Sequence, residues 1–109
     1  MQAKFVVFAA AIEGRTQEMS HWYDNQHFPD LLRVPGLVKA ESYDLQLVKA
    51  PDGAGPWDRL SIYSFDTPDL QTSLKEMGRR MGTEEMPTSP ALDSSKTLAY
   101  LALPRRDQA

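Results

Sequence analysis

The 109-residue chain contains no cysteine, only two histidines and no long hydrophobic run. The absence of cysteine excludes disulfides, thiolate catalysis and iron–sulfur clusters, and nothing indicates an oxidising compartment. The longest apolar run covers eight residues, 5–12, whereas a membrane-spanning helix needs about 20. No basic segment with a cleavage site marks a signal peptide. We therefore expect a cytoplasmic protein with no membrane partner.

Charge and length limit the partners and the architecture further. Twelve basic and fifteen acidic residues give a net charge of −3, and no basic cluster is longer than two residues. Nucleic acid is therefore not an expected partner, and an RNA-binding reading of the aromatic strand residues is disfavoured. A chain of this length builds one hydrophobic core, so residues 1–109 are expected to form a single domain.

Hydrophobic periodicity predicts four strands and two main helices. The second helix has the clearer start, with Thr67 as its N-cap and a proline at its first position, and Gly82 is expected just after its end. Its apolar stripe comprises Leu70, Leu74, Met77 and Met81. We expect strands over residues 5–11, 37–50, 59–65 and 96–103, a first helix over 17–26, loops over 51–56 and 83–95, and a polar tail over 105–109.

The element order is β-α-β-β-α-β, which predicts an α+β, ferredoxin-like plait with a four-stranded antiparallel sheet and both helices on one face. The near-continuous apolar run over residues 5–11 predicts a strand that is buried on both faces. The second predicted strand has apolar residues on both faces, which indicates a bulge or an exposed edge near Asp44. The sheet face opposite the helices has no cover within the chain, and a large exposed apolar patch usually marks an interface. We therefore expect a homodimer in which sheet faces sheet.

The end of the first helix concentrates the chemistry of the chain. Both histidines, two acids and one of the two tryptophans lie between His21 and Asp30, with Pro29 inside the run. Proline removes a donor and pushes Phe28 away from helical angles, so the helix is expected to stop or kink near His27. His27 would then lie at a broken helix end, where the dipole favours a cation.

Two stretches in this region resemble those of a known family. They are Trp22-Tyr23-Asp24-x-x-His27-x-Pro29-Asp30 and Val34-Pro35-Gly36. This pattern is similar to that of the dimeric α/β-barrel proteins, particularly the EthD-like branch, and the element order agrees over nearly the whole chain. The resemblance implies a homodimer with a ligand cavity between sheet and helices in each subunit. The wider superfamily includes polyketide cyclases, cofactor-independent monooxygenases, muconolactone isomerases, decarboxylase or dehydratase proteins and haem-degrading enzymes, so no single reaction follows.

His27, Asp24 and Tyr63 are the candidate catalytic residues. Asp24 precedes His27 by three positions, so its carboxylate can orient the imidazole and raise its pKa, as a general acid/base requires. Tyr63 can donate a proton or a hydrogen bond to a carbonyl. In the competing interpretation, His27 has a structural role: it caps the broken helix by donating a hydrogen bond to a backbone carbonyl. His21 is expected to face solvent, and Asp30 to play a structural role.

Aromatic residues supply the candidate substrate contacts. They are Trp22, Tyr23, Phe28, Tyr43 and Tyr100. Each could also be a core or rim residue, since tryptophan and tyrosine combine an apolar body with a polar tip. Two histidines six residues apart make a poor metal site, the methionines of the second helix are read as core, and no phosphate-binding loop or GxSxG motif occurs.

These observations predict a cofactor-independent acid/base enzyme, without a metal, acting on a small apolar or aromatic carbonyl or phenol compound. Lyase, cyclase and cofactor-free monooxygenase reactions all fit this description. The alternative is a non-catalytic binding or accessory protein on the same dimeric scaffold.

Overall fold

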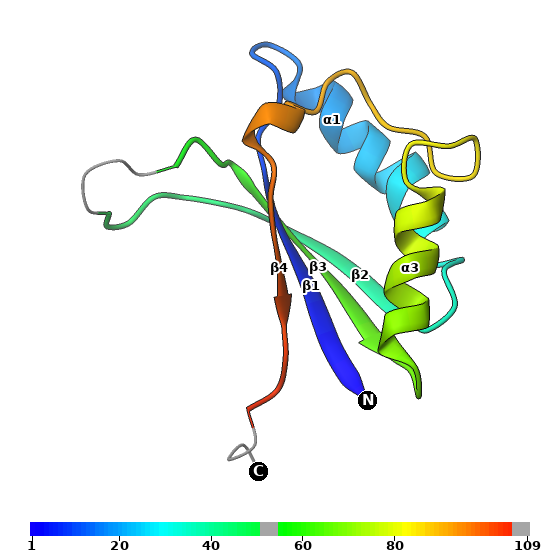
Figure 1. Ribbon diagram of the computed structural model, residues 1–109. Coiled ribbons are helices and arrows are strands. Elements are labelled where there is room, and N and C mark those ends of the chain that lie inside the picture. The colour runs from blue at the N-terminus through cyan, green and yellow to red at the C-terminus, as the bar shows by residue number, and fades with distance from the viewer. Residues whose placement is uncertain (51–54, 106–109) are drawn as a thin grey trace.

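The structure, a computed structural model, describes residues 1–50 and 55–105 and arranges them around one four-stranded antiparallel sheet (Figure 1). The strand order is β2-β3-β1-β4, and the main helices lie on one face of the sheet. This confirms the predicted ferredoxin-like plait. The elements are β1 (Gln2–Ala9), α1 (Thr16–Trp22), the π-helical turn η1 (Tyr23–His27), α2 (Phe28–Leu31), β2 (Leu37–Asp44), β3 (Arg59–Asp66), α3 (Leu70–Arg80), the 3₁₀ turn η2 (Ser94–Lys96) and β4 (Leu98–Ala102).

The core lies between the sheet and the helices. In β3, every second side chain from Arg59 to Phe65 is buried, whereas Leu60 and Ile62 point to the other face and are half-buried. In β1 the face towards the helices carries the buried residues Ala3, Val7 and Ala9, whereas Val6 on the other face is only half-buried, because no helix covers it. The expected burial of this strand on both faces is therefore wrong. The main core cluster comprises Ala3, Val7, Leu31, Val34, Leu37, Tyr63, Phe65, Leu70, Met77 and Met86.

Strand β2 is shorter than its sequence predicts. It ends at Asp44 rather than continuing to residue 50, because β3 begins only at Arg59, which pairs with Asp44. The register shift lies between Leu37 and Lys39, so a bulge near Asp44 is wrong. The alternative expectation, an exposed edge near Asp44, is confirmed, since β2 is an edge strand and Tyr43 and Asp44 are exposed. The predicted turn over residues 51–54 and the tail over 106–109 lie outside the described residues.

The start of α3 also differs from the prediction, although its end does not. Asp69 is the N-cap: its carboxylate accepts a hydrogen bond from the Thr72 amide at 3.2 Å. Thr67 instead fixes the preceding turn, where its hydroxyl accepts from the Asp69 amide. At the other end, Gly82 follows the C-cap with φ of +80°, as predicted. Leu70 and Met77 are buried, whereas Met81 is exposed, so the buried part of the apolar stripe ends one stripe residue earlier than expected.

The turn between α2 and β2 requires glycine. Gly36 has φ of +90°, and a Cβ atom there would lie 2.9 Å from the Thr67 Cβ. A larger residue would therefore be strained in its backbone and would collide with the start of the α3 unit.

The sheet face opposite the helices carries no helix within the described residues (Figure 1), although the Trp57 ring packs on it against Phe8, with ring centroids 5.6 Å apart. The strand register places a mixed set of side chains on this face, apolar near one end and polar near the other. Its apolar and aromatic members are Val6, Phe8, Tyr43, Leu60, Ile62, Leu98, Tyr100 and Ala102. No helix in residues 1–50 and 55–105 combines the length and apolar character needed to cross a bilayer.

Candidate functional site

The helix that carries the predicted motif does not break at Pro29. Phe28 keeps helical angles, with φ of −64° and ψ of −46°, and its amide donates to the carbonyl of Tyr23, five residues back. The turn from Tyr23 to His27 has thus widened into a π-helix, and α2 continues directly from it. The expected stop of the helix near His27 is therefore wrong, although the type of helix does change at His27 and Pro29 lies in the first turn of α2. The wider turn instead accommodates the proline, and it directs both Tyr23 and His27 into the interior.

His27 lies in an aromatic cluster between this helix and the sheet. Its ring stacks on Trp22 with centroids 4.4 Å apart and an interplanar angle of 19°. Two phenol rings make edge-type contacts with the imidazole, and their centroids lie 5.6 Å (Tyr23) and 6.0 Å (Tyr63) from the centroid of the His27 ring. His27 is only 4% exposed, and its Nδ1 has no hydrogen-bond partner. A buried polar atom left without a partner costs free energy, so it is a candidate for contact with a ligand.

Burial determines the charge of this imidazole. Desolvation lowers the pKa of His27 from 6.5 to about 4, and the charge of Asp30 opposes this effect only in part. The ring is therefore neutral at pH 7. The expected cation at a broken helix end is wrong, and so is the expected rise in pKa from Asp24. Asp24 is exposed, and the carboxylate that acts on His27 is that of Asp30.

The neighbouring phenols remain protonated. Tyr63 and Tyr23 are 2% and 1% exposed, and burial raises the pKa of both phenols above the ordinary value. Each phenol can therefore donate a hydrogen bond at any physiological pH. The cluster thus holds two protonated phenols in ring contact with one neutral imidazole.

Trp22 and Phe28 hold the cluster together. The Trp22 indole nitrogen donates to the Pro87 carbonyl at 3.0 Å, which ties the segment after α3 to this helix. Phe28 packs at 5.4 Å from Tyr23 and 6.1 Å from Tyr63, between ring centroids. Both side chains therefore have structural roles that do not depend on a ligand.

The two remaining candidate tyrosines lie on the opposite face of the sheet. Tyr43 is directly across from Leu60, and its hydroxyl donates to Glu41 at 2.8 Å. Tyr100 is across from Val6 on the edge strand and is 57% exposed. The structure therefore does not bring Tyr43 and Tyr100 together with His27. His21 is exposed, as expected, and contacts Asn25.

Sequence reasoning missed Arg59, which lies beside the aromatic cluster. Its guanidinium carbon is 4.9 Å from the centroid of the Tyr23 ring, and the residue is 8% exposed. Its nitrogens donate to the hydroxyls of Ser42, at 3.0 Å, and Ser20. The alternation of β3 contains the signal that could have found it, because Arg59 lies on the same strand face as Tyr63.

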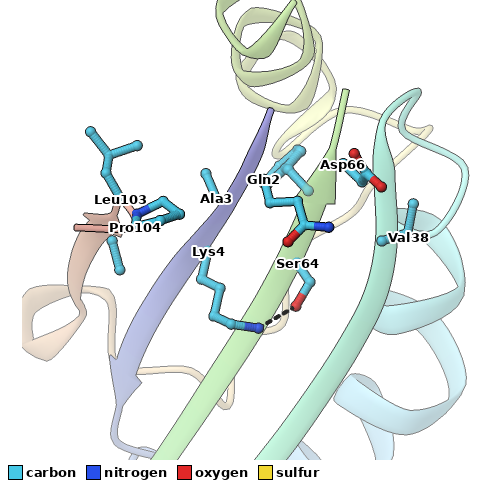
Figure 2. Close-up of a pocket in the computed structure, with 10 residues that line it drawn as sticks. Gln2, Ala3, Lys4, Val38, Ser64, Asp66, Leu103 and Pro104 are labelled. Carbon is cyan, nitrogen blue, oxygen red and sulfur yellow. Dashed lines mark hydrogen bonds between the residues drawn. The ribbon is translucent and has the colours of Figure 1, made fainter. Parts of the chain in front are cut away.

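Two hollows lie outside the aromatic cluster, and the larger of them is on the sheet face opposite the helices. The larger, of about 400 Å³, lies where the N-terminal half of β1 meets the ends of β3 and β4 (Figure 2). Figure 2 shows Lys4 and Ser64 at its floor, joined by a hydrogen bond of 3.1 Å. The second hollow, of about 370 Å³, lies between α1 and the start of β3 and has Arg59 in its wall. His27 lines neither hollow, so a ligand reaches it only if neighbouring side chains move.

No group of three acidic, histidine or cysteine side chains is close enough to hold a metal within residues 1–50 and 55–105. A site without metal or cofactor remains a prediction from the sequence.

Comparison with known proteins gives the fold but no reaction. No family model and no curated protein matches the chain. The chain is similar to the crystal structure of an ethyl tert-butyl ether D (EthD) family protein from Bacillus halodurans C-125, with a TM-score of 0.58 and 15% identity over 96% of this chain and 100% of that chain. It is also similar to a hypothetical protein from Pyrococcus horikoshii, with a TM-score of 0.42 and 19% identity over 97% and 94% of the two chains. The first likeness confirms the EthD-like resemblance at the level of the fold.

Proposed function

We propose that this protein is a homodimeric, cofactor-independent acid/base enzyme acting on a small apolar or aromatic carbonyl or phenol compound. The observation that carries the proposal is the buried, neutral imidazole of His27, whose Nδ1 has no partner in the described structure. Such a group is costly to the fold, and buried titratable groups with shifted pKa values are concentrated at functional sites.

The proposed roles follow from the protonation states. His27, neutral at pH 7, accepts a proton from a carbon acid or a phenol of the substrate. The protonated phenol of Tyr63 donates a hydrogen bond to the substrate oxygen on which negative charge develops. Asp30 stabilises the imidazolium that forms, because its charge acts on His27. The same ring then returns the proton to the product.

The competing function is that of a non-catalytic small-molecule-binding or accessory protein. One observation favours it: His27 lines neither hollow, whereas Arg59 does. In this reading, ligands bind beside the aromatic cluster, and the imidazole never contacts them.

Homodimer formation is part of the proposal. The uncovered sheet face carries Val6, Ile62 and Tyr100, and a second copy would cover them. The segment after β2 supports this, since Leu47 and Val48 are 72% and 93% exposed. A cytoplasmic location also remains a prediction from the sequence.

Paired substitutions of the two histidines test the function. The measurement is turnover of a panel of aromatic ketones, β-diketones and phenols by the wild-type protein, His27→Asn and His21→Asn. Asparagine keeps hydrogen-bonding groups but does not titrate, so His27→Asn should lower turnover roughly 10²–10⁴-fold in a folded protein. The exposed His21→Asn variant is the control and should retain full activity. Equal turnover by wild type and folded His27→Asn would remove His27 from the mechanism.

A further inference from the structure

We propose that the hollow at the start of β3 is a carboxylate-binding site, in which Arg59 anchors a small monocarboxylate with an apolar body. This inference deepens the proposed function, since it names the charged group of the substrate. It depends on that function only for the claim that the bound compound is also turned over.

The first observation is a buried guanidinium without a close acidic partner. An arginine is always charged, and a buried one normally meets a carboxylate in a two-pronged hydrogen bond. Here the hydrogen-bond acceptors are the neutral hydroxyls of Ser20 and Ser42. The nearest carboxylate oxygen, on Asp44, is 4.0 Å away, and the Asp44 side chain is 96% exposed. Arg59, whose side chain is 10% exposed, therefore keeps donors for a further acceptor.

The second observation is the space in front of this charge. The hollow of about 370 Å³ is in the size range of small-ligand sites. Three elements contribute to its wall: α1, the end of β2 and the start of β3. Its walls combine apolar and polar side chains, namely Met19, Ser20, Asp44, Leu45, Asp58 and Arg59. A compact aromatic or aliphatic acid would set its carboxylate on Arg59 and its body against Met19 and Leu45.

The two exposed acids at this hollow limit the charge of the ligand. Asp44 and Asp58 both line it, so a dianion such as phosphate would meet stronger repulsion than a monocarboxylate. The Asp44 side chain is almost fully exposed, so solvent can hydrate its carboxylate without Arg59. A ligand carboxylate would replace the distant contact that Asp44 makes with Arg59.

The position of Arg59 connects this hollow with the aromatic cluster. Its guanidinium lies over one ring, Tyr23, at 4.9 Å, and that ring is 5.6 Å from His27 between centroids. The anchored carboxylate is thus one aromatic ring away from the proposed proton carrier.

Titration of the wild-type protein with benzoate tests the inference. Two further probes, benzyl alcohol and inorganic phosphate, supply an uncharged and a doubly charged comparison. Benzoate should shift the NMR signals of the Arg59 side chain and the Ser20 amide, with a Kd of about 1 mM or tighter. Both comparison compounds should bind at least roughly tenfold more weakly. Absence of a shift at Arg59 at about 10 mM benzoate would overturn the proposal.

Variants of charged residues supply the second arm. Arg59→Met should weaken benzoate binding at least roughly tenfold, whereas the exposed Arg79→Met is the matched control and should bind like wild type. If Arg59→Met does not fold, Asp44→Asn decides the question. Removal of the competing carboxylate should tighten benzoate binding by roughly threefold or more, and unchanged affinity in this variant would overturn the proposal.

Failure of this site and failure of the proposed function are distinguishable. His27→Asn should bind benzoate as tightly as wild type while it loses turnover. Loss of turnover in His27→Asn without any benzoate site would refute only the role of Arg59. A benzoate site with unchanged turnover would refute only the role of His27.

Discussion

The charge state of His27 follows from competition between burial and one acidic neighbour. Desolvation in an aromatic surround disfavours the imidazolium, and Asp30 restores only part of the loss. The stacked Trp22 and the edge-on Tyr23 supply no hydrogen bond to Nδ1. His27 is therefore a neutral base in the folded protein, and protonation of this residue at low pH should lower the free energy of unfolding.

The lowered pKa of His27 predicts that stability depends on pH. The unfolded chain binds a proton at His27 near pH 6.5, whereas the folded protein binds it only near pH 4, so the unfolded state holds more protons in between. The contribution of neutral His27 is complete above about pH 6.5 and is lost as the pH falls towards about 4. Between about pH 7.5 and pH 5 the free energy of unfolding should fall by about 2 kcal/mol through this residue alone.

Denaturant unfolding at both pH values measures this effect. His27→Asn has no titrating group, so its loss of stability over the same interval should be about 2 kcal/mol smaller than that of wild type. Carboxylates that titrate in both proteins cancel in the comparison. An equal loss in the two proteins would show that burial does not hold the imidazole neutral.

At the residue scale, sequence reasoning found the aromatic cluster but not its charges. The motif identified Tyr23, His27 and Phe28. Tyr63 was one of three candidate tyrosines on the strands, and the other two lie on the opposite face of the sheet. The pairing of His27 with Asp24 failed because a three-residue spacing brings two side chains together only in a regular α-helix. Arg59 was missed because its partners come from two segments, the first helix and β2, that lie far from it in the sequence.

At the element scale, the π-helical turn is the main departure from expectation. Rules for proline describe the α-helical register, in which Pro29 would interrupt the ladder of hydrogen bonds. One wider turn avoids the interruption, since the Phe28 amide reaches the Tyr23 carbonyl and the chain continues as helix. Sequence alone does not distinguish a break from a widened turn, because tertiary packing of Tyr23 and His27 decides between them.

Alanine substitutions along α3, at side chains of different burial, test how this helix packs on the core. Met77 is 4% exposed in the main core cluster, whereas Met81 on the same predicted stripe is 39% exposed. Met77→Ala should lower the free energy of unfolding by roughly 2–5 kcal/mol through loss of burial and creation of a cavity. Leu74 is only partly buried, so Leu74→Ala should cost less than Met77→Ala.

The control for this test is Met81→Ala, which should change stability by less than about 0.5 kcal/mol. Denaturant unfolding of the three variants gives the ranking. A cost for Met81→Ala equal to that of Met77→Ala would show that the whole stripe is buried, in contradiction to the structure.

At the scale of the whole molecule, the uncovered sheet face predicts self-association. Sedimentation of the wild-type protein at micromolar concentration should show a species of about twice 12.3 kDa. Tyr100→Asp should yield monomers, because it places a charge on this face at a residue that is already 57% exposed in the monomer. Gln71→Asp, on the exposed surface of α3, is the control and should remain dimeric.

A stable wild-type monomer would contradict the sheet-to-sheet arrangement. The fold itself was predictable because the order of strands and helices, the alternation in β3 and the stop at Gly82 all indicate one topology. The proposal of a second copy as partner rests on the sheet face that no helix of the described residues covers. Strand ends were not predictable, since β2 stops where β3 begins to pair and not where its own apolar residues end.

The most direct test of the account is the NMR titration of the His27 imidazole. With ¹⁵N-labelled histidine, the His21→Asn variant leaves one ring to observe. The account predicts a midpoint of about 4, which falls further in Asp30→Asn and stays in place in Asp24→Asn. A midpoint at or above the ordinary value of 6.5 would mean that His27 is charged near neutral pH. That result would contradict the claim that a buried, neutral imidazole is the base at this site.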